Sequence, residues 1–479
     1  MAKKDYNLIV IGGGSAGLSS AYIAAAVKAR VALIEKHKMG GDCLNTGCVP
    51  SKALIRTSQI LSYIRRHKEF GLRSATVSFD FADVMERVQK VIRKVAPHDS
   101  VERYTGLGVD CYTGHAQILS PHEVRVDGKT LTAGSIIIAT GAKAFVPPIP
   151  GLDKIPILTS DNVWDIRELP EKLVVAGGGP IGSELAQCFA RLGSRVTQVE
   201  MLPGLISRED SEFSQALYDG FVREGINVMT NTKCKEIVVE NGKRIMLTEC
   251  DDKEGRTEFD QILVAVGRRA NSAGFGLEEL GVKTSKYGNI EVDEYLRTTA
   301  HKNIFACGDV AGPFQFTHTA AHQAWYCVVN ALFGPFKKFK VDYRVVPWCT
   351  FTDPEVARVG LNELDAKAQG IPCDVTRYGI DDLDRAIADA EDHGMVKVLT
   401  VPGKDKILGV TIMGYHAGDL IAEYVSAMKH GIGLNKILGT IHIYPTMAEA
   451  NKYAAGVWKK AHTPGIVFNF LRKFHAWRR

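Results

Sequence analysis

The sequence predicts an α/β protein with two doubly wound domains, followed by a smaller α+β domain. Three observations predict this fold. An apolar strand, a Gly-x-Gly-x-x-Gly turn and a helix occur in that order near residue 6 and again near residue 173. In both copies an acid stands 23 residues after the first glycine, at the end of a second strand. From about residue 345, strands and helices alternate without a further glycine motif.

Composition narrows the class of protein. The chain has 479 residues, of which 45% are hydrophobic and 24% charged, and this length suits roughly three domains. The formal net charge of +5 is small for the length and does not argue for nucleic acid as a partner. No apolar run approaches the roughly 18 residues of a membrane-spanning helix. Ten cysteines, eight of them scattered, and a start that lacks a secretory signal predict a reducing, cytoplasmic location.

The first copy of the motif predicts a dinucleotide site. Strand 6–11 leads into the glycine turn and a helix over 18–27, and strand 30–34 ends at the acid. The glycines let the backbone approach a pyrophosphate at the helix N-terminus, and the acid accepts hydrogen bonds from a ribose. The predicted contacts are Gly12, Gly14, Ser15, Ala16, Gly17, Glu35 and Lys36.

The second copy predicts a second dinucleotide site. Strand 173–176, a helix over 183–192 and strand 195–199 surround the predicted contacts Gly177, Gly179, Pro180, Ile181, Gly182 and Glu200. A carboxylate at position 200 favours the free 2′-hydroxyl of NADH and repels the 2′-phosphate of NADPH. Arg195 and Arg208 are near enough in sequence to reach such a phosphate, so NADPH stays an alternative.

Residues 40–52 carry the only close cysteine pair, Cys43 and Cys48, with four residues between them. They precede a helical pattern over 53–64, so a thiolate at the first helical turn would be stabilised by unpaired N–H groups. Lys52 adds a positive charge one turn after Cys48. The cysteine pair by itself is compatible with two interpretations, a structural bridge and a reactive disulfide. A reducing compartment favours the reactive disulfide.

Domain boundaries follow from the linkers. Apolar strand 135–139 ends at Thr140-Gly141 and is followed by Pro147, Pro148 and Pro150, which indicate a linker. Strand 261–266 leads to Gly267-Arg268, and residues 303–312 resemble a strand-to-helix turn that carries Asp309. We therefore predict one nucleotide domain over 1–150 and 275–345, a second over 151–274, and an interface domain over 346–479.

The last residues, 465–479, interleave aromatic and aliphatic side chains with Arg and Lys. Such a segment fits weak contact with a membrane surface, which would place the protein peripherally at the inner membrane. A helix packed on its own chain or on a partner subunit is the alternative.

Together these residues closely resemble the pyridine nucleotide-disulfide oxidoreductases, the family of dihydrolipoamide dehydrogenase, glutathione reductase and mercuric reductase. The resemblance covers nearly the whole chain. It rests on Gly-Gly-x-Cys-x-Asn-x-Gly-Cys-Val-Pro-Ser-Lys at 40–52, the two glycine motifs, Ala139-Thr-Gly141, Gly308-Asp309, Thr317-His318 and Thr352-Asp-Pro354. It implies FAD at the first motif and a nicotinamide nucleotide at the second. It also implies a homodimer in which the C-terminal domain completes the partner's active site.

The resemblance implies a role for each residue of the redox site. Cys48 would face the flavin and form a charge-transfer species when reduced, and Cys43 would exchange with substrate. Lys52 would sit near the flavin and pair with Glu184. Asp309 would bind the ribityl chain, and no resident metal is expected. The remaining implied cofactor contacts are Gly41, Asp42, Ala139, Thr140, Gly141, Gly267, Arg268, Gly308, Thr317 and His318.

One position departs from the family's His-Pro-Thr-x-x-Glu motif, in which the Glu holds a catalytic His. This sequence has Tyr444 before Pro445, with Glu449 at the motif's Glu. Tyrosine has a reference pKa near 10 and is a poor proton acceptor at neutral pH. His442 is the remaining candidate base, on the same side as Tyr444 if the segment is extended. A histidine packed near the subunit interface is the alternative.

The departure bears on the substrate. Mercuric reductases resemble this chain in having tyrosine at that position, since a thiophilic metal ion needs no proton relay. They also carry a C-terminal cysteine pair and an N-terminal metal-capture domain, which we do not expect here. Pro180 replaces the aromatic residue that gates the nicotinamide pocket of glutathione reductases.

We therefore expect an NAD(P)H-dependent FAD oxidoreductase of the mercuric-reductase-like branch, whose acceptor is a thiophilic metal ion, a quinone or another small oxidant. A dihydrolipoamide dehydrogenase is the first alternative, supported by Glu200 and the 442–449 segment. A flavoprotein held at a membrane by its basic tail, delivering electrons to a partner, is the second.

Overall fold

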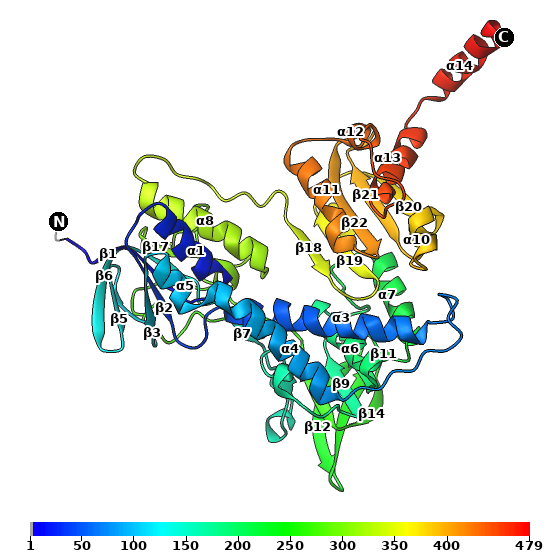
Figure 1. Ribbon diagram of the computed structural model, residues 1–479. Coiled ribbons are helices and arrows are strands. Elements are labelled where there is room, and N and C mark those ends of the chain that lie inside the picture. The colour runs from blue at the N-terminus through cyan, green and yellow to red at the C-terminus, as the bar shows by residue number, and fades with distance from the viewer. Residues whose placement is uncertain (1–2) are drawn as a thin grey trace. The chain divides into compact units, whose positions relative to one another are not determined.

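The computed structural model describes residues 3–479 and divides into two compact units (Figure 1). The first unit comprises the chain up to residue 62, residues 76–203 and residues 222–342. The second unit comprises residues 63–75, 204–221 and 343–479. The first unit contains two largely parallel sheets and the second an antiparallel sheet with helices, so the predicted fold class is confirmed.

The first sheet is built around β1, which pairs in parallel with β2 and β6. Its strand order is β3-β2-β1-β6-β5-β4, and β17 pairs in parallel with β6. The bounds are β1 (Tyr6–Ile11), β2 (Val31–Glu35), β3 (Val109–Thr113), β4 (Gln117–Ser120), β5 (Glu123–Val126), β6 (Lys129–Ile138) and β17 (Ile304–Ala306).

The two faces of β1 explain why its sequence is almost continuously apolar. Leu8 and Val10 pack with α1 (Ser15–Ala26) and α8 (Thr317–Phe333) on one face. Ile9 and Ile11 belong to the core on the other face, because successive side chains of a strand point in opposite directions. A parallel strand covered on both faces is buried along its whole length.

The second sheet repeats this arrangement in the order β11-β10-β9-β15-β8, with all pairs parallel. Its strands are β8 (Leu158–Thr159), β9 (Lys172–Ala176), β10 (Arg195–Val199), β11 (Asn227–Met229) and β15 (Gln261–Val264). Helix α6 (Pro180–Leu192) begins three residues before the predicted start, because proline's fixed φ suits the first helical position.

The first unit also contains two small antiparallel sheets and further helices. A meander of β12 (Lys233–Glu240), β13 (Lys243–Cys250) and β14 (Lys253–Phe259) was not predicted. A ribbon pairs β7 (Ala142–Ala144) with β16 (Arg268–Ala270). The helices are α2 (Gly41–Asn45), α3 (Cys48–Arg65), α4 (Phe81–Val95) and α5 (Val101–Gly106), of which α3 ends in the second unit.

The second unit has an antiparallel sheet in the order β18-β19-β22-β21-β20. Its strands are β18 (Pro347–Thr350), β19 (Glu355–Gly360), β20 (Asp374–Gly379), β21 (Met395–Thr400) and β22 (Ile407–Gly414). Its helices are α7 (Ser211–Arg223), α9 (Glu363–Ala368), α10 (Asp384–Ala388), α11 (Ala417–Lys429), α12 (Leu434–Leu438), α13 (Glu449–Ala461) and α14 (Gly465–Arg478). Tyr424 of α11 is fully buried in the core between helices and sheet.

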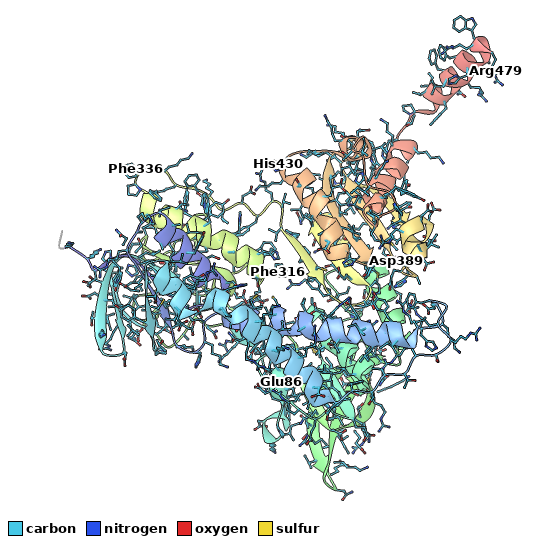
Figure 2. All side chains as sticks on the ribbon, viewed as in Figure 1. Glu86, Phe316, Phe336, Asp389, His430 and Arg479 are labelled. Atoms are coloured by element: carbon cyan, nitrogen blue, oxygen red, sulfur yellow. The ribbon has the colours of Figure 1, made fainter. Side chains whose placement is uncertain are left out.

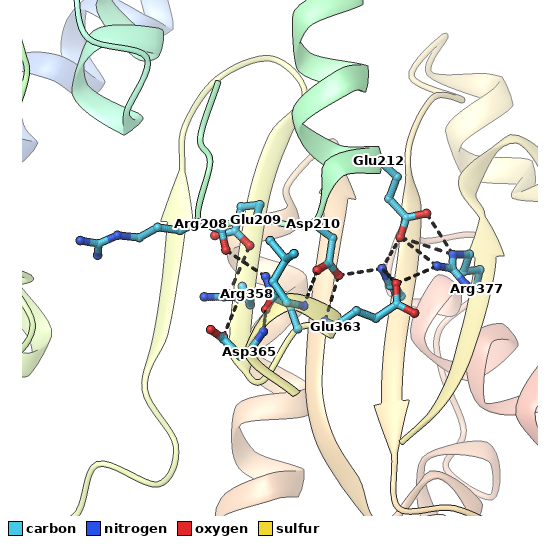
Figure 3. A network of polar contacts seen from close by, with 11 residues as sticks. Arg208, Glu209, Asp210, Glu212, Arg358, Glu363, Asp365 and Arg377 are labelled. Atoms are coloured by element: carbon cyan, nitrogen blue, oxygen red, sulfur yellow. Dashed lines mark hydrogen bonds and ion pairs between the residues drawn. The ribbon is translucent and has the colours of Figure 1, made fainter. Parts of the chain in front are cut away.

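A buried lysine joins α7 to this sheet. Lys397 of β21 is only 1% exposed, and its Nζ lies 2.7 Å from both Asp210 Oδ2 and Glu363 Oε2. Lys397 also pairs with Glu212. Arg377 of β20 bonds to the same carboxylate (Figure 3). A buried ammonium needs such partners, because taking a charge out of water is costly.

Among the described residues, no helix is both long and apolar enough to cross a membrane.

Candidate active site

The predicted redox cysteines lie in two successive helices of the first unit. Cys43 is in α2, and Cys48 is the first residue of α3. Both are free thiols. Cys43 is half-buried and Cys48 is exposed within this chain, so exposure to solvent does not by itself identify Cys43 as the outward thiol.

Two helix N-termini meet at Cys48. Its Sγ lies 3.5 Å from Thr317 Oγ1, and Thr317 is the first residue of α8. The hydrogen bond from the Cys43 thiol lowers the pKa of Cys48 to about 5, and the Thr317 hydroxyl and the positive charge of Lys52 act in the same direction. Conversely, the bond to Cys48 and burial raise the pKa of Cys43. At neutral pH the pair therefore holds one thiolate, on Cys48.

Lys52 and Glu184 are in contact. Lys52 Nζ lies 2.8 Å from Glu184 Oε2. This ion pair joins α3 to α6, the helix that packs against β9 and β10 of the second sheet. The Glu184 side chain is buried and the lysine is partly exposed. The contact places the charge of Lys52 one helical turn from Cys48, as the spacing predicts.

Trp164 fixes the loop between the two cysteines, and sequence reasoning missed it. Its indole Nε1 donates to the carbonyl oxygen of Thr46 at 2.9 Å and to that of Ser160 at 2.7 Å. The ring is buried. A buried indole N–H normally finds an acceptor, and here the acceptor is the backbone of the redox loop. The only sequence signal is an isolated tryptophan far from the motif.

Arg268 bridges two predicted cofactor-binding carboxylates. It forms an ion pair with Asp42, and its Nε lies 3.6 Å from Asp309 Oδ2. Burial raises the pKa of Asp309 to about 6, and the positive charge of Arg268 opposes that rise. The three residues come from separate parts of the sequence, and the positive charge of Arg268 opposes the rise in pKa that burial causes in both acids.

At the first glycine motif, the backbone makes close approaches that only glycine allows. A Cβ on Gly41 would lie 2.6 Å from Gly14 Cα, and one on Gly17 would lie 1.7 Å from the carbonyl oxygen of Gly12. The redox loop and the motif therefore touch through glycine backbones. Glu35 accepts hydrogen bonds from the N–H groups of Gly13 at 2.6 Å and His37 at 2.7 Å.

The second glycine motif has the same geometry. Glu200 accepts from the N–H groups of Gly178 at 2.6 Å and Leu202 at 2.8 Å. A Cβ on Gly179 would meet no atom within 4 Å, so the backbone there is open to a ligand. A Cβ on Gly182 would lie 2.2 Å from the carbonyl oxygen of Gly177, which packs helix against strand.

The structure separates Arg195, one of the two cations considered for a 2′-phosphate, from Glu200. Arg195 begins β10 and pairs with Glu171, whereas Glu200 follows the other end of the strand. At about 3.3 Å per residue, some 16 Å of strand separates the two side chains. Arg208 lies in the second unit, where its carbonyl oxygen accepts from Asn362.

The other predicted cofactor residues are found on turns and helix ends of the first unit. Thr140 of the Ala139-Thr140-Gly141 turn donates from its hydroxyl to the carbonyl oxygen of Asn271 at 2.6 Å. The N–H of Gly308 donates to Gln323 Oε1 at 2.6 Å. Ser15 and Ala16 open α1, Pro180 and Ile181 open α6, Gly267 precedes β16, Lys36 follows β2, and His318 stacks on Phe316.

The C-terminal candidates lie in the second unit. Tyr444, 65% exposed, donates from its hydroxyl to Asp384 Oδ2 of α10 at 2.9 Å. The His442 side chain is only 7% exposed, and its Nε2 lies 3.0 Å from Glu423 Oε1 of α11. The two side chains therefore do not share a side, because residues 440–446 are irregular rather than an extended strand.

Glu449 does not contact His442. Its carboxylate lies near the Thr446 N–H and the Tyr453 hydroxyl, each at 3.4 Å, at the start of α13. Glu423 takes its place beside the histidine, and the sequence offered no signal for it. The other ring nitrogen, Nδ1, lies 3.1 Å from the carbonyl oxygen of Thr440. Both nitrogens of His442 therefore face oxygen acceptors in this chain.

Comparison with known families accounts for the constellation. Residues 6–324 match the model for pyridine nucleotide-disulphide oxidoreductases, and residues 346–455 match the dimerisation domain of the same proteins. The chain belongs to the pyridine nucleotide-disulphide oxidoreductase family. It is thus an enzyme of that oxidoreductase family, as its motifs indicate.

Its relatives within this family carry different names. A mercuric reductase of Staphylococcus aureus is 34% identical over 95% of this chain and 83% of its own length. A dihydrolipoyl dehydrogenase of Chlamydia muridarum is 36% identical over 93% of this chain and 95% of its own. Among solved structures, the HOCl-induced flavoprotein disulfide reductase RclA of Escherichia coli is 27% identical, with a TM-score of 0.84, over 94% of this chain and all of that one.

The first motif fits the FAD of this flavoprotein family. Gly12 has a φ of +107°, and a Cβ there would lie 2.4 Å from the carbonyl oxygen of Ala139, so the turn requires glycine. Glu35, placed by two backbone bonds, ends the neighbouring strand. The N-terminus of α1 and this carboxylate would hold the pyrophosphate and the ribose, and Asp309 with Arg268 would hold the ribityl side.

Proposed function

We propose that this enzyme passes electrons from NADH, through FAD and the Cys43–Cys48 disulfide, to a thiophilic metal ion or another small acceptor. The observation that carries the proposal is the asymmetric thiol pair. Cys48 has a pKa of about 5 where α3 and α8 both begin, and Cys43 stays protonated beside it. A stable thiolate beside a protonated, exchangeable thiol is the arrangement that a dithiol relay requires.

The proposed reaction balances in two halves. NADH gives up a hydride, which supplies two electrons and one proton, reduces the disulfide to the Cys48 thiolate and the Cys43 thiol, and leaves NAD⁺. FAD, when bound, supplies the two-electron transfer between nicotinamide and disulfide. A divalent thiophilic ion then takes two electrons as the thiolate–thiol pair returns to the disulfide and releases one proton. Between the halves, Cys48 holds the charge and Cys43 the proton.

The preference for NADH rests on the end of β10. The carboxylate of Glu200 is held by two backbone N–H groups, where a ribose would be bound. A 2′-phosphate at this point would meet a negative charge. Arg195, the nearby cation that could have balanced it, pairs with Glu171 at the opposite end of the strand.

The acceptor is proposed from the absence of a base at position 444. The bond to Asp384 raises the pKa of Tyr444, which keeps the phenol protonated at neutral pH. Disulfide exchange needs a group that takes up and returns a proton, whereas a metal ion bound by thiolates does not. The dihydrolipoamide dehydrogenase alternative is favoured by one observation, the contact between His442 and Glu423, which resembles an acid–base pair.

The assembly and location are also proposals. The dimerisation domain supports a homodimer in which each C-terminal domain completes the partner's site. Ten free cysteines among the described residues support a reducing cytoplasm. Contact of residues 465–479 with a membrane is independent of the acceptor, because the tail carries no residue of the disulfide site.

An acceptor screen tests the proposal. Purified holoenzyme is mixed with NADH or NADPH and with Hg(II), lipoamide, oxidised glutathione or a quinone, and oxidation of the nucleotide is followed. We expect NADH to be used with higher kcat/KM than NADPH, and Hg(II) or the quinone to exceed both disulfides. Faster turnover with lipoamide, or with dihydrolipoamide and NAD⁺, would select the dehydrogenase instead.

Three cysteine variants provide the controls. Cys48→Ser is expected to abolish the long-wavelength absorbance that develops on reduction, and Cys43→Ser to keep it while losing turnover. Cys111→Ser, in β3 away from the pair, is expected to change neither. Full turnover in both Cys43→Ser and Cys48→Ser would show that electrons bypass the disulfide.

A further inference from the structure

Among the helices that the structure describes over residues 3–479, α14 (Gly465–Arg478) is the long one that has no buried residue. Figure 1 shows it in red, clear of α13 and of the sheet of the second unit. Seven large apolar side chains on it are exposed: Ile466, Val467, Phe468, Phe470, Leu471, Phe474 and Trp477. Trp477 is 81% exposed and Ile466 is 77% exposed. Contiguous exposed apolar surface of this kind marks a binding site.

Four of these seven apolar residues form one stripe. Ile466, Phe470, Phe474 and Trp477 follow the helical repeat and lie on one face. The Phe470 and Phe474 ring centroids are 6.3 Å apart, and those of Phe474 and Trp477 are 6.2 Å apart. These ring contacts form a continuous aromatic ladder along the helix.

The charge around this stripe has one sign. Residues 459–479 contain six Lys or Arg side chains and no Asp or Glu: Lys459, Lys460, Arg472, Lys473, Arg478 and Arg479. Arg472 lies on the face away from the ladder, and Lys473 lies at the edge of the ladder, because it is seven residues after Ile466 and four before Trp477. Arg478 lies over the Phe474 ring at 5.7 Å, at the margin of the ladder. The helix thus combines an aromatic face with a cationic rim.

We propose that α14 lies on the surface of an anionic lipid membrane, with the aromatic ladder among the acyl chains and the basic residues at the headgroups. Aromatic rings favour this interfacial depth, and Lys and Arg are attracted to anionic lipids. Because residues 459–479 carry basic side chains and no acid, their charge is complementary to that of an anionic surface. Because α14 has 14 residues, it is too short to span a bilayer and would lie parallel to its plane.

The link to the body of the second unit allows this placement. Helix α13 ends at Ala461, and Pro464 precedes α14 in an extended conformation. Proline removes a backbone donor and interrupts the helix, so α13 and α14 are separate rods. His462 holds the end of α13 against β20, because its Nε2 lies 3.0 Å from Asp374 Oδ2 and its ring stacks on Trp458. The proposal does not depend on which acceptor the enzyme uses.

Flotation of the full-length holoenzyme with vesicles tests the proposal. We expect the protein to float with phosphatidylcholine–phosphatidylglycerol vesicles and not with phosphatidylcholine alone. Each basic residue near an anionic surface strengthens binding about fivefold, so the anionic vesicles should bind at least tenfold more strongly. Failure to float with the anionic vesicles would overturn the proposal, and so would equal flotation with both.

Variants separate the two parts of the surface. The ladder variant removes the aromatic rings but keeps every charge; it carries Phe470→Ser, Phe474→Ser and Trp477→Ser. The charge variant keeps the rings but removes four positive charges; it carries Arg472→Gln, Lys473→Gln, Arg478→Gln and Arg479→Gln. Each set is expected to lower binding at least tenfold while NADH oxidation is unchanged. The matched control is Phe336→Ser with Lys337→Gln and Lys338→Gln, an exposed aromatic and basic cluster elsewhere (Figure 2), which should bind as the parent does.

Two further measurements distinguish the membrane from a protein occupant. The emission of Trp477, taken as the difference between the parent and Trp477→Phe, should shift to the blue when anionic vesicles are added. Sedimentation without vesicles should give the same oligomeric state for the parent and the ladder variant. A lower oligomeric state in the ladder variant would show instead that α14 covers another copy of the chain, and would overturn the proposal.

Discussion

Cys48 Sγ lies 3.5 Å from Thr317 Oγ1, although 269 residues separate them in the sequence. The contact brings the first residue of α3 to the first residue of α8. Each helix N-terminus presents unpaired N–H groups and the positive end of a dipole, which favour a thiolate. The asymmetry of the cysteine pair is therefore built by the two helices together with the bond between the thiols.

The bond from Cys43 is the largest cause of the low pKa of Cys48, and its removal should raise that pKa. In the reduced parent enzyme, Cys48 is a thiolate above about pH 5 and a thiol below it. In Cys43→Ala the midpoint is expected to move towards the ordinary value of about 8.5. The pH dependence of Cys48 alkylation by iodoacetamide, followed by peptide mass spectrometry, gives both midpoints.

Cys43→Ser is the matched variant, because its hydroxyl still donates to Cys48. The pH midpoint of Cys48 alkylation in Cys43→Ser should lie nearer to the midpoint of the parent than the midpoint of Cys43→Ala does. An unchanged midpoint in Cys43→Ala would assign the low pKa to Thr317, Lys52 and the helix dipoles instead.

Local pattern was enough to predict the fold and to select the candidate site residues. The glycine motifs, the acids that follow them and Cys48 at a helix start depend on spacing within about 30 residues, where helix and strand periods leave a clear signal. The Asn241-Gly242 hairpin between β12 and β13 also had such a signal, since both residues have positive φ, and it was missed.

The partners of the site residues could not be predicted in the same way. Trp164 reaches Thr46, and Glu423 reaches His442, only because tertiary packing brings separate elements together. Neither pair has a spacing that a helix or strand would produce. Asp384 likewise gives no sign in the sequence that it binds the Tyr444 hydroxyl. Candidate site residues that belong to a local motif were therefore easier to select from the sequence than the residues that contact them.

Trp164→Phe should loosen the loop between the cysteines. The change keeps an aromatic ring but removes the donor to the Thr46 and Ser160 carbonyl oxygens, which leaves buried acceptors unpaired at a cost of about 1 to 3 kcal/mol. We expect lower thermal stability, and a fall in kcat with NADH bound as before, because the thiols are less well placed. Trp325→Phe, on the exposed side of α8, is the control. Parent-like kcat and melting temperature in Trp164→Phe would show that the loop holds itself in place.

Glu200→Ala should weaken the discrimination between NADH and NADPH. A hydrogen bond to a charged group is worth about 1.5 to 3 kcal/mol, so the ratio of the two kcat/KM values should shift by about tenfold to hundredfold towards NADPH. Arg195→Gln, at the far end of β10, should leave the ratio unchanged. If Arg195→Gln lowered NADPH use selectively, the arginine would contact the 2′-phosphate after all.

His442→Ala and Tyr444→Phe should differ in their effects on a disulfide acceptor. Both ring nitrogens of His442 face acceptors, the Thr440 carbonyl and the Glu423 carboxylate, so the variant loses buried contacts. Tyr444→Phe loses only an exposed bond to Asp384. If His442 is structural, His442→Ala lowers stability and affects all acceptors alike. If His442→Ala instead lowers turnover with lipoamide by about 10²-fold or more and leaves turnover with Hg(II) unchanged, His442 acts as a base.

Lys397→Met should destabilise the second unit by about 3 kcal/mol, because it leaves Asp210, Glu212 and Glu363 without their shared cation. Burial pulls the pKa of Lys397 down, but its bonds to these carboxylates outweigh burial and hold it above the ordinary value. Arg377→Gln, which removes an exposed partner of the same carboxylates, should cost no more than about 1 kcal/mol. Urea unfolding of both variants measures the difference.

The same network determines an acid dependence. Burial tends to raise the pKa of Glu212, but bonds from Arg377 and Lys397 overcome it and lower that pKa. A carboxyl whose folded pKa is depressed stabilises the protein above its unfolded pKa of about 4.3, and the contribution is lost as pH falls through the folded value. The parent should therefore lose stability progressively below about pH 4.3. Lys397→Met should lose less over the same range, because the folded pKa of Glu212 then lies closer to its unfolded value. Parallel acid profiles for the two proteins would show that Lys397 does not hold this carboxylate in its charged form.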